Sequence, residues 1–179
     1  MYDIDIKSSI QKSKIVEKTS FWNKLSDVFF YALVFGGLPF VAIINLKEKL
    51  DQQAPLQTAV IILIVIMLLV FYLLYALVNI DKLYRIQGVS KNMNRKIVLE
   101  VAEELDWINL KHTQHISVFS KKWTWTSWHW GRRLIVIYDR NDVLINCISY
   151  GRYELKSPFH HWIDRRTINK WKKKILQKN

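Results

Sequence analysis

The chain has 179 residues, enough for one domain of ordinary size with an appendage, and carries a formal net charge of +12 although half of its residues are hydrophobic. Its single cysteine, Cys147, excludes an intramolecular disulfide and a cysteine-based metal cluster, and it favours a reducing compartment for the polar part of the chain. Lys and Arg are almost absent between Val28 and Val78 and frequent from Asn79 onward, so the apolar and basic segments are separate.

The first 27 residues form a mostly polar arm that contains several lysines. A cleavable signal peptide would place its apolar core closer to the start and follow it with a small-residue cleavage site, which this sequence lacks. We therefore expect residues 1–27 to be a cytoplasmic N-terminal arm, and the apolar segment after it to be retained.

The first apolar run extends from Val28 to Leu46 and has no charged residue. Gly36, Gly37 and Pro39 lower its helical propensity, but a membrane span tolerates them where a neighbouring helix packs closely. We expect residues 28–46 to form transmembrane helix 1, with these three residues at a helix-packing surface, either within a two-helix hairpin or between subunits of a homo-oligomer. A hinge at residues 37–39 is the alternative.

The second apolar run, Ala59 to Val78, is uncharged and apolar on every side, and at about 1.5 Å per residue it covers a hydrocarbon core of about 30 Å. It is predicted as transmembrane helix 2, with residues 47–58 as an extracytoplasmic loop. Lys and Arg are frequent before the first span and after the second, whereas the two lysines of the loop are balanced by Glu48 and Asp51. The positive-inside rule therefore places both termini in the cytoplasm. The expected location is the cell inner membrane, as a multi-pass protein.

After a linker at residues 79–90, the chain is expected to form a cytoplasmic α+β domain over residues 91–179. Apolar residues from Ile97 to Leu105 recur at helical spacing, and Ser90 is a suitable N-cap. The acidic residues at 100, 103, 104 and 106 would form the solvated face of this helix, or a docking surface for the basic C-terminal helix.

Three β-rich segments follow, at His115–Phe119, Arg132–Asp139 and Val143–Tyr150, with a hairpin turn at residues 140–142 between the last two. A final helix is expected from about Arg165 to Gln177. The predicted fold is thus a two-helix transmembrane hairpin followed by a small α+β domain, with a helix, a three-stranded antiparallel sheet and a second helix. Both helices would cover one face of the sheet.

Between the first two predicted strands lies a stretch with four tryptophans in eight residues and basic pairs at both ends. It could form a hairpin whose aromatic face packs on a helix, a tip that enters the headgroup layer of anionic lipids, or a stacking platform for a nucleotide or nucleic acid. The candidate membrane-surface or ligand-binding residues are Lys121, Lys122, Trp123, Trp125, Trp128, Trp130, Arg132 and Arg133.

The final helix combines basic residues with apolar ones at i, i+3 and i+7, as in a helix that lies on an anionic membrane. An apolar stripe turned toward the sheet, with a solvated basic face, fits the same pattern. The residues of the expected lipid-facing basic helix are Arg165, Arg166, Lys170, Trp171, Lys172, Lys173 and Lys174.

The sequence favours neither a metal site nor a cofactor. His112 and His115 lie at a junction without an acidic cluster, and His160 and His161 are adjacent, so their side chains diverge in regular structure. No glycine-rich phosphate loop or nucleophile elbow is present, and Cys147 falls in a predicted strand, where a buried inert thiol is expected.

These features predict a non-enzymatic interaction module at the membrane surface, with anionic lipids as partner. In outline the architecture is similar to two-span membrane effectors of bacterial immune signalling, although no motif is shared. That resemblance implies the alternative of an effector that binds a nucleotide or other anion, oligomerises and perturbs the membrane. A third hypothesis is a lipid-acting enzyme with His115 or His129 as base.

Overall fold

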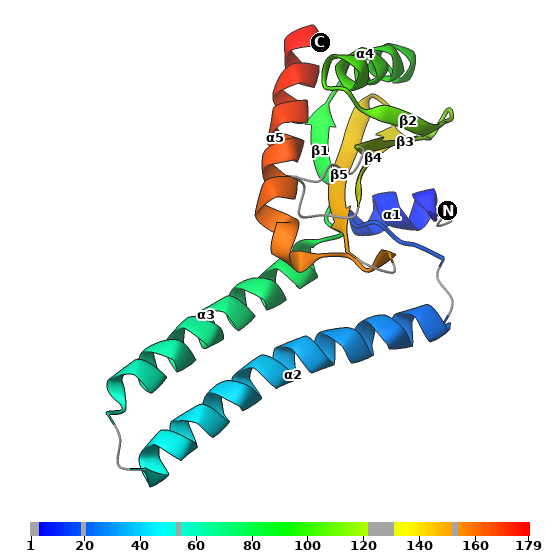
Figure 1. Ribbon diagram of the computed structural model, residues 1–179. Coiled ribbons are helices and arrows are strands. Elements are labelled where there is room, and N and C mark those ends of the chain that lie inside the picture. The colour runs from blue at the N-terminus through cyan, green and yellow to red at the C-terminus, as the bar shows by residue number, and fades with distance from the viewer. Residues whose placement is uncertain (1–3, 19–20, 53–54, 122–130, 152–153) are drawn as a thin grey trace. The chain divides into compact units, whose positions relative to one another are not determined.

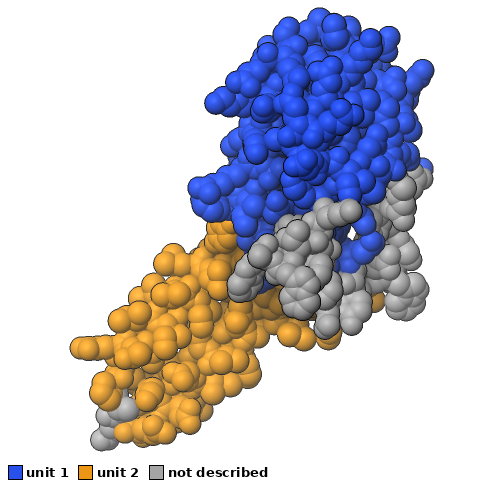
Figure 2. All heavy atoms as spheres, turned by 45° about the horizontal axis from the view of Figure 1, so that its top comes forward, with its two compact units in different colours: residues 1–18, 78–179 blue, residues 19–77 orange. Residues whose placement is uncertain are grey.

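A computed structural model describes residues 4–18, 21–52, 55–121, 131–151 and 154–179 of the chain (Figure 1). The chain divides into two compact units, one made of Met1–Lys18 with Val78–Asn179 and the other of Thr19–Leu77 (Figure 2). The larger unit therefore contains both ends of the chain, and the smaller unit is an insertion within it.

The smaller unit consists of two long apolar helices packed as a hairpin, α2 (Phe21–Asp51) and α3 (Gln57–Asn79). Both are long and apolar enough to cross a membrane over residues 27–51 and 57–79, which have mean hydropathies of 2.0 and 3.2. The helix α2 continues through Pro39 without a break. Most of the described apolar side chains on both helices are exposed, and an apolar surface of this extent marks a contact with protein or with a membrane.

The larger unit is built on an antiparallel sheet of five strands within the described residues, in the order β1-β5-β4-β3-β2. The strands are β1 (Tyr84–Gln87), β2 (Ile108–His112), β3 (Ile116–Lys121), β4 (Gly131–Asp139) and β5 (Asp142–Tyr150). The three predicted strands correspond to β3, β4 and β5, but the expectation of a three-stranded sheet was wrong. The two missed strands are short edge strands, with only Ile86 buried in β1 and no buried residue in β2, so they lack the apolar signal of the central strands.

The helices α4 (Lys91–Glu104) and α5 (His161–Lys178) cover one face of the sheet, as the sequence predicts (Figure 1). Ser90 caps α4 by accepting a hydrogen bond from the Met93 backbone N–H. The core on this face contains an aromatic cluster in which Trp171 of α5 packs against Trp107 and Phe119, with ring centroids 5.9 and 5.6 Å away. Burial of such large side chains contributes strongly to the stability of a small domain.

The N-terminal arm covers the opposite face of the sheet. It contains the short helix α1 (Ile6–Lys12) and contributes Ile15 to a second apolar cluster with Ile116, Ile137 and Leu144. Asp5 caps α1 through a hydrogen bond from the Ser8 N–H. The larger unit thus has helices on both sides of the sheet, and residues that precede the hairpin complete a fold made mostly of residues that follow it (Figure 1).

Candidate functional site

The segment that follows α3, Ile80–Leu83, is held by the arm, and we call it the junction segment. The Ile15 N–H donates to the Asp81 carbonyl at 2.8 Å, and the Leu83 N–H donates to the Ser13 carbonyl at 3.0 Å. The chain that precedes the first candidate span is therefore bonded directly to the chain that leaves the second one. Both segments lie on the same side of any membrane that the hairpin crosses.

Residues of the sheet and of the loop after β5 also bind the junction segment. Asn146 of β5 is buried and donates its amide hydrogens to the carbonyls of Ile80 and Lys82, at 3.0 and 2.7 Å. The ammonium of Lys156 lies 2.6 Å from the Asp81 carboxylate and 3.2 Å from that of Glu17. Burial by itself lowers the pKa of Lys156, but Asp81 and Glu17 outweigh it and the pKa is raised, so the side chain is a cation.

The structure does not bring the described basic residues of the tryptophan-rich stretch onto one surface. Lys121 donates to the Leu105 carbonyl at 2.8 Å and so binds the C-terminal end of α4. Arg132 lies on the same face of the sheet, whereas Arg133 points to the opposite face, since side chains alternate along a strand. Arg133 packs over the Tyr150 ring at 4.7 Å and pairs with Glu154 at 2.7 Å. The other candidates in this stretch, Lys122, Trp123, Trp125, Trp128 and Trp130, lie outside the described residues, as does His129.

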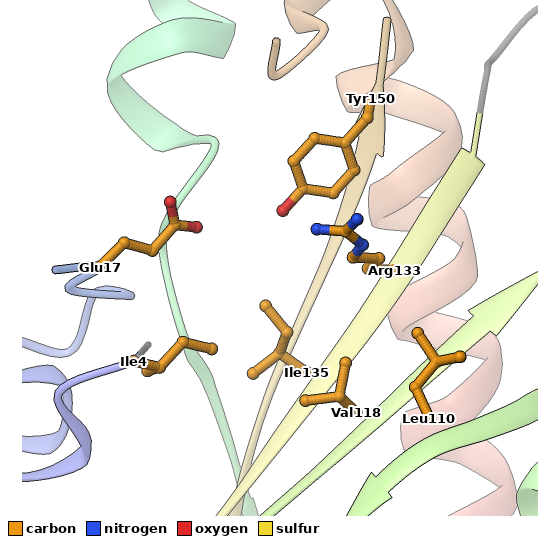
Figure 3. A pocket seen from close by; sticks show the side chains of 7 residues that line it. All are labelled: Ile4, Glu17, Leu110, Val118, Arg133, Ile135 and Tyr150. Carbon is orange, nitrogen blue, oxygen red and sulfur yellow. The ribbon is translucent and has the colours of Figure 1, made fainter. Parts of the chain in front are cut away.

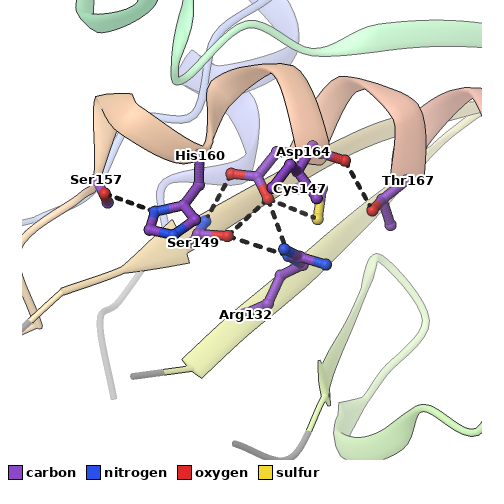
Figure 4. Close-up of polar contacts among 8 residues, drawn as sticks. Arg132, Cys147, Ser149, Ser157, His160, Asp164 and Thr167 are labelled. Atoms are coloured by element: carbon purple, nitrogen blue, oxygen red, sulfur yellow. Dashed lines mark hydrogen bonds and ion pairs between the residues drawn. The ribbon is translucent and has the colours of Figure 1, made fainter. Parts of the chain in front are cut away.

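Arg132 takes part in a buried polar network at the start of α5 (Figure 4). Its guanidinium lies 3.0 Å from the carboxylate of Asp164, which also accepts hydrogen bonds from the backbone N–H and hydroxyl of Ser149 at 2.9 and 2.7 Å. Burial raises the pKa of Asp164 to about 6, although the bonds from Ser149 and the charge of Arg132 act in the opposite direction. The network joins α5 to β4 and β5. Burial also raises the pKa of the adjacent Cys147 thiol, which is consistent with an unreactive side chain.

A pocket of about 300 Å³ lies on the arm-covered face of the sheet (Figure 3). Val118 and Ile135 form its apolar floor, with Ile4 and Glu17 of the arm on one side and Leu110 of β2 on the other. Arg133 and Tyr150 add polar groups at one end. The pocket is of the size and composition that suits a small amphipathic molecule.

The basic C-terminal helix has two different faces. Trp171 is fully buried in the core, so it is part of the apolar stripe that covers the sheet and not a lipid-facing residue. Lys174 and Lys178 are paired with the acidic residues of α4, at 3.1 Å from Glu104 and 3.1 Å from Glu100 respectively. Glu100 and Glu104 thus neutralise the C-terminal end of α5, which agrees with the alternative that the acidic residues of α4 form a docking surface for the basic helix.

The remaining cations of the helix are Arg165, Arg166, Lys170, Lys172 and Lys173, and within the described residues no ion pair to an acidic side chain occurs at any of them. Arg165 packs over the Tyr84 ring at 5.1 Å, and Arg166 over the Trp162 ring at 3.5 Å. Three exposed apolar side chains precede them, Phe159, Trp162 and Ile163. These three residues were not predicted from the sequence, although their positions at i, i+3 and i+4 mark one helix face.

Gly36 and Gly37 of α2 have open space beside them within the part of the chain that the structure describes. A Cβ added at either position would meet no atom within 4 Å. Their role in helix packing, within the hairpin or in a homo-oligomer, stays a prediction.

His112 and His115 both contact polar or charged side chains of neighbouring elements. His115 is exposed and lies 3.0 Å from the ammonium of Lys91, with its Nδ1 as the contacting atom. His112 contacts Arg95 and Ser117 at 3.0 and 2.7 Å, and burial together with the Arg95 charge lowers its pKa. Among the described residues no group of three His, Cys, Asp or Glu side chains is close enough to hold a metal ion.

Comparison with known proteins identifies no relative. No protein-family model matches the chain, and no curated protein or solved structure shows significant similarity to it.

Proposed function

We propose that this is an integral membrane protein of the bacterial inner-membrane type, in which the helical hairpin holds a non-enzymatic interaction module at the cytoplasmic surface. The observation that carries the proposal is the junction segment, where the arm, the sheet and the exit of α3 are bonded together. Because both ends of the hairpin enter one folded unit, the module cannot move away from the bilayer by more than a few residues of chain.

The charge distribution supports this topology. Lys82, Arg85, Lys91, Arg95 and Lys96 follow closely after the second span, and positively charged residues next to a span favour retention on the cytoplasmic side. The larger unit also carries cations on α5 that have no acidic partner among the described residues. An anionic bilayer surface attracts such cations by about 1 kcal/mol each. Anionic lipid is therefore the partner that the chemistry of the module favours.

Cysteine labelling in intact cells tests the topology. Lys12→Cys and Gln177→Cys place exposed thiols at the two ends of the larger unit, and Gln52→Cys places one in the loop between the spans. A membrane-impermeant maleimide should label only position 52 until the cells are permeabilised, and alkaline carbonate should not release the chain from membranes. Labelling of position 12 or 177 from outside, or release by carbonate, would refute the proposal.

A second candidate function follows from the pocket. Two of its lining residues, Ile4 and Glu17, belong to the arm, and α2 begins only four residues after Glu17. A ligand in the pocket would contact the arm close, along the chain, to the start of the first span. This proximity favours a gated effector in which an amphipathic anion binds beside Arg133 and changes the assembly of the spans.

The pocket-filling variant Val118→Trp distinguishes the two candidates. In a gated effector it should abolish ligand-dependent depolarisation of cells that express the protein, while leaving the labelling pattern of the topology experiment unchanged. In a plain interaction module neither the wild-type chain nor the variant depolarises cells. Ile116→Trp, at a buried position of the same strand that does not line the pocket, is the control for the effect of an added indole.

A further inference from the structure

The start of α5 carries an exposed apolar patch, composed of Phe159, Trp162 and Ile163. These residues are 53, 56 and 42 % exposed, respectively. They lie within five residues of one another on one side of the segment formed by η2 (Pro158–His160) and the first turn of α5. A cluster of large apolar side chains rimmed by polar groups is the usual mark of a contact surface.

Cations continue this surface along the helix. Arg166, Lys170 and Lys173 follow Trp162 at helical spacing, on the side opposite to the buried residues Ile168, Trp171 and Ile175. The acids of α4 pair with Lys174 and Lys178, which leaves these three cations without an acidic partner among the described residues. The exposed face of α5 is therefore apolar at its start and positively charged in its middle.

The patch is tied to the exit of the second candidate span. Lys156, which is ion-paired with Asp81 of the junction segment, precedes Phe159 by three residues. Three residues extend over at most about 11 Å between Cα atoms. The patch consequently follows, within a few residues along the chain, the side chain that binds the junction segment, where the chain leaves α3.

We propose that Phe159, Trp162 and Ile163 insert into the headgroup layer of an anionic bilayer, and that Arg166, Lys170 and Lys173 bind the anionic headgroups around them. The inference rests on the proposed function, because it requires the hairpin to span the membrane. Tryptophan suits the headgroup layer since its ring is apolar and its N–H can stay hydrated. The Arg166 guanidinium over the Trp162 ring, at 3.5 Å, keeps a positive charge at the same depth as the indole.

Tethering favours lipid over a soluble partner as the occupant. The patch is held next to the bilayer by the chain, so its local concentration at the lipid surface is high without a further binding partner. The three cations add the charge complementarity that an anionic leaflet requires. An acidic protein would satisfy the cations but not the preference of the three apolar groups for the headgroup layer.

Depth-dependent fluorescence quenching in nanodiscs tests the proposal on the full chain. An environment-sensitive dye is attached to Ile163→Cys, with Asn109→Cys on the exposed edge strand β2 as the matched control position. The native Cys147 is buried, and the unsubstituted chain shows the background labelling. The discs contain phosphatidylcholine with or without phosphatidylglycerol, together with a phospholipid that carries a spin-label quencher.

The dye at position 163 should be quenched in discs with phosphatidylglycerol, and much less in discs of phosphatidylcholine alone or at high salt. The dye at position 109 should not be quenched in either. Replacing Arg166, Lys170 and Lys173 by Glu should reduce the quenching at position 163 to the level in neutral discs, and Trp162→Ser should reduce it as well. Because all four side chains are exposed, thermal unfolding in detergent should be unchanged.

Lack of quenching at position 163 in anionic discs, or equal quenching at positions 163 and 109, would overturn the inference and leave an acidic protein as the occupant of the surface. The topology experiment separates this outcome from failure of the proposed function. If both termini are protected in intact cells and position 163 is still not quenched, the hairpin spans the membrane and only the docking surface is wrong. If either terminus is labelled from outside, the proposed function itself fails.

Discussion

Lys156 and Asp81 form an ion pair of 2.6 Å that joins the loop after β5 to the junction segment. The Glu17 carboxylate lies 3.2 Å from the same ammonium and connects the end of the arm to this ion pair. A single side chain thus connects the segment before the first candidate span, the segment after the second and the loop that leads to α5.

Lys156→Met should lower the free energy of unfolding of the larger unit by about 1–3 kcal/mol, because Asp81 and the mostly buried Glu17 lose their charged donor. Chemical denaturation of the full chain in detergent, followed by near-UV circular dichroism, measures this change. Lys170→Met is the matched control, since Lys170 is exposed, and it should change the free energy by less than about 0.5 kcal/mol. Equal effects of the two substitutions would contradict the role of Lys156.

Ile15→Ala tests whether the arm is part of the core. The side chain is 5 % exposed and packs in the cluster on the second face of the sheet. Its truncation should cost about 2–5 kcal/mol, as for other buried aliphatic side chains. The control is Gln11→Ala on the exposed side of α1, which should be nearly neutral. A neutral Ile15→Ala in the same denaturation experiment would show that the arm does not contribute to stability.

The adjacent residues Arg132 and Arg133 should respond differently to truncation. Arg132→Ala leaves the carboxylate of Asp164 buried without its counter-charge, which should cost about 3 kcal/mol. Arg133→Ala removes an ion pair with the exposed Glu154 and should cost about 1 kcal/mol or less. Thermal unfolding of the two variants at neutral pH compares them, and a larger loss for Arg133→Ala would contradict the assignment of the two side chains to opposite faces.

Asp164 should make the larger unit less stable as the pH rises. Its pKa is about 6 in the folded chain against an ordinary value of 3.8, so between these values the folded state binds more protons than the unfolded state. The contribution of this carboxyl is therefore fully present below pH 4 and is lost as the pH rises through about 6, with a total change of about 3 kcal/mol.

The variant Asp164→Asn lacks this titration and isolates the effect. Its unfolding free energy relative to wild type should rise between pH 4 and pH 7, by the same amount of about 3 kcal/mol, as measured by urea denaturation at a series of pH values. Parallel pH profiles of the two chains would contradict the raised pKa of Asp164.

Two tryptophans of α5 provide a further test of which side of the helix is buried. Trp171→Ala should cost about 3–5 kcal/mol, because the side chain is fully buried between Trp107 and Phe119. Trp162→Ala should cost less than about 0.5 kcal/mol, since Trp162 is 56 % exposed. Thermal unfolding of both variants in detergent measures the difference, and similar losses would contradict the orientation of α5.

Much of the fold could be predicted from the strong periodic patterns of the sequence. The two apolar runs, the helix capped by Ser90 and the strands β3, β4 and β5 all follow from patterns that continue over at least five residues. The edge strands β1 and β2 do not, because β1 is only four residues long and β2 has no buried residue, so their positions depend on pairing with other strands.

The candidate site was predicted less well, for a physical reason. Lys121, Arg132 and Arg133 are close along the chain and were therefore predicted to share one surface, but side chains alternate along β4, so Arg132 and Arg133 lie on opposite faces of the sheet. The arm was treated as a separate segment because its few isoleucines form no long apolar run. Its role depends on contacts with residues more than sixty positions away, which no local pattern reveals.

The order of synthesis follows from the arm on the second face of the sheet. Ile15 leaves the ribosome first, but the strands on which it packs are made only after both spans have been completed. At translation rates of about 5–20 residues per second, the arm waits for several seconds without its binding surface. Both apolar helices are therefore synthesised before the larger unit can assemble, and an N-terminal fusion that blocks the arm should impair folding of that unit.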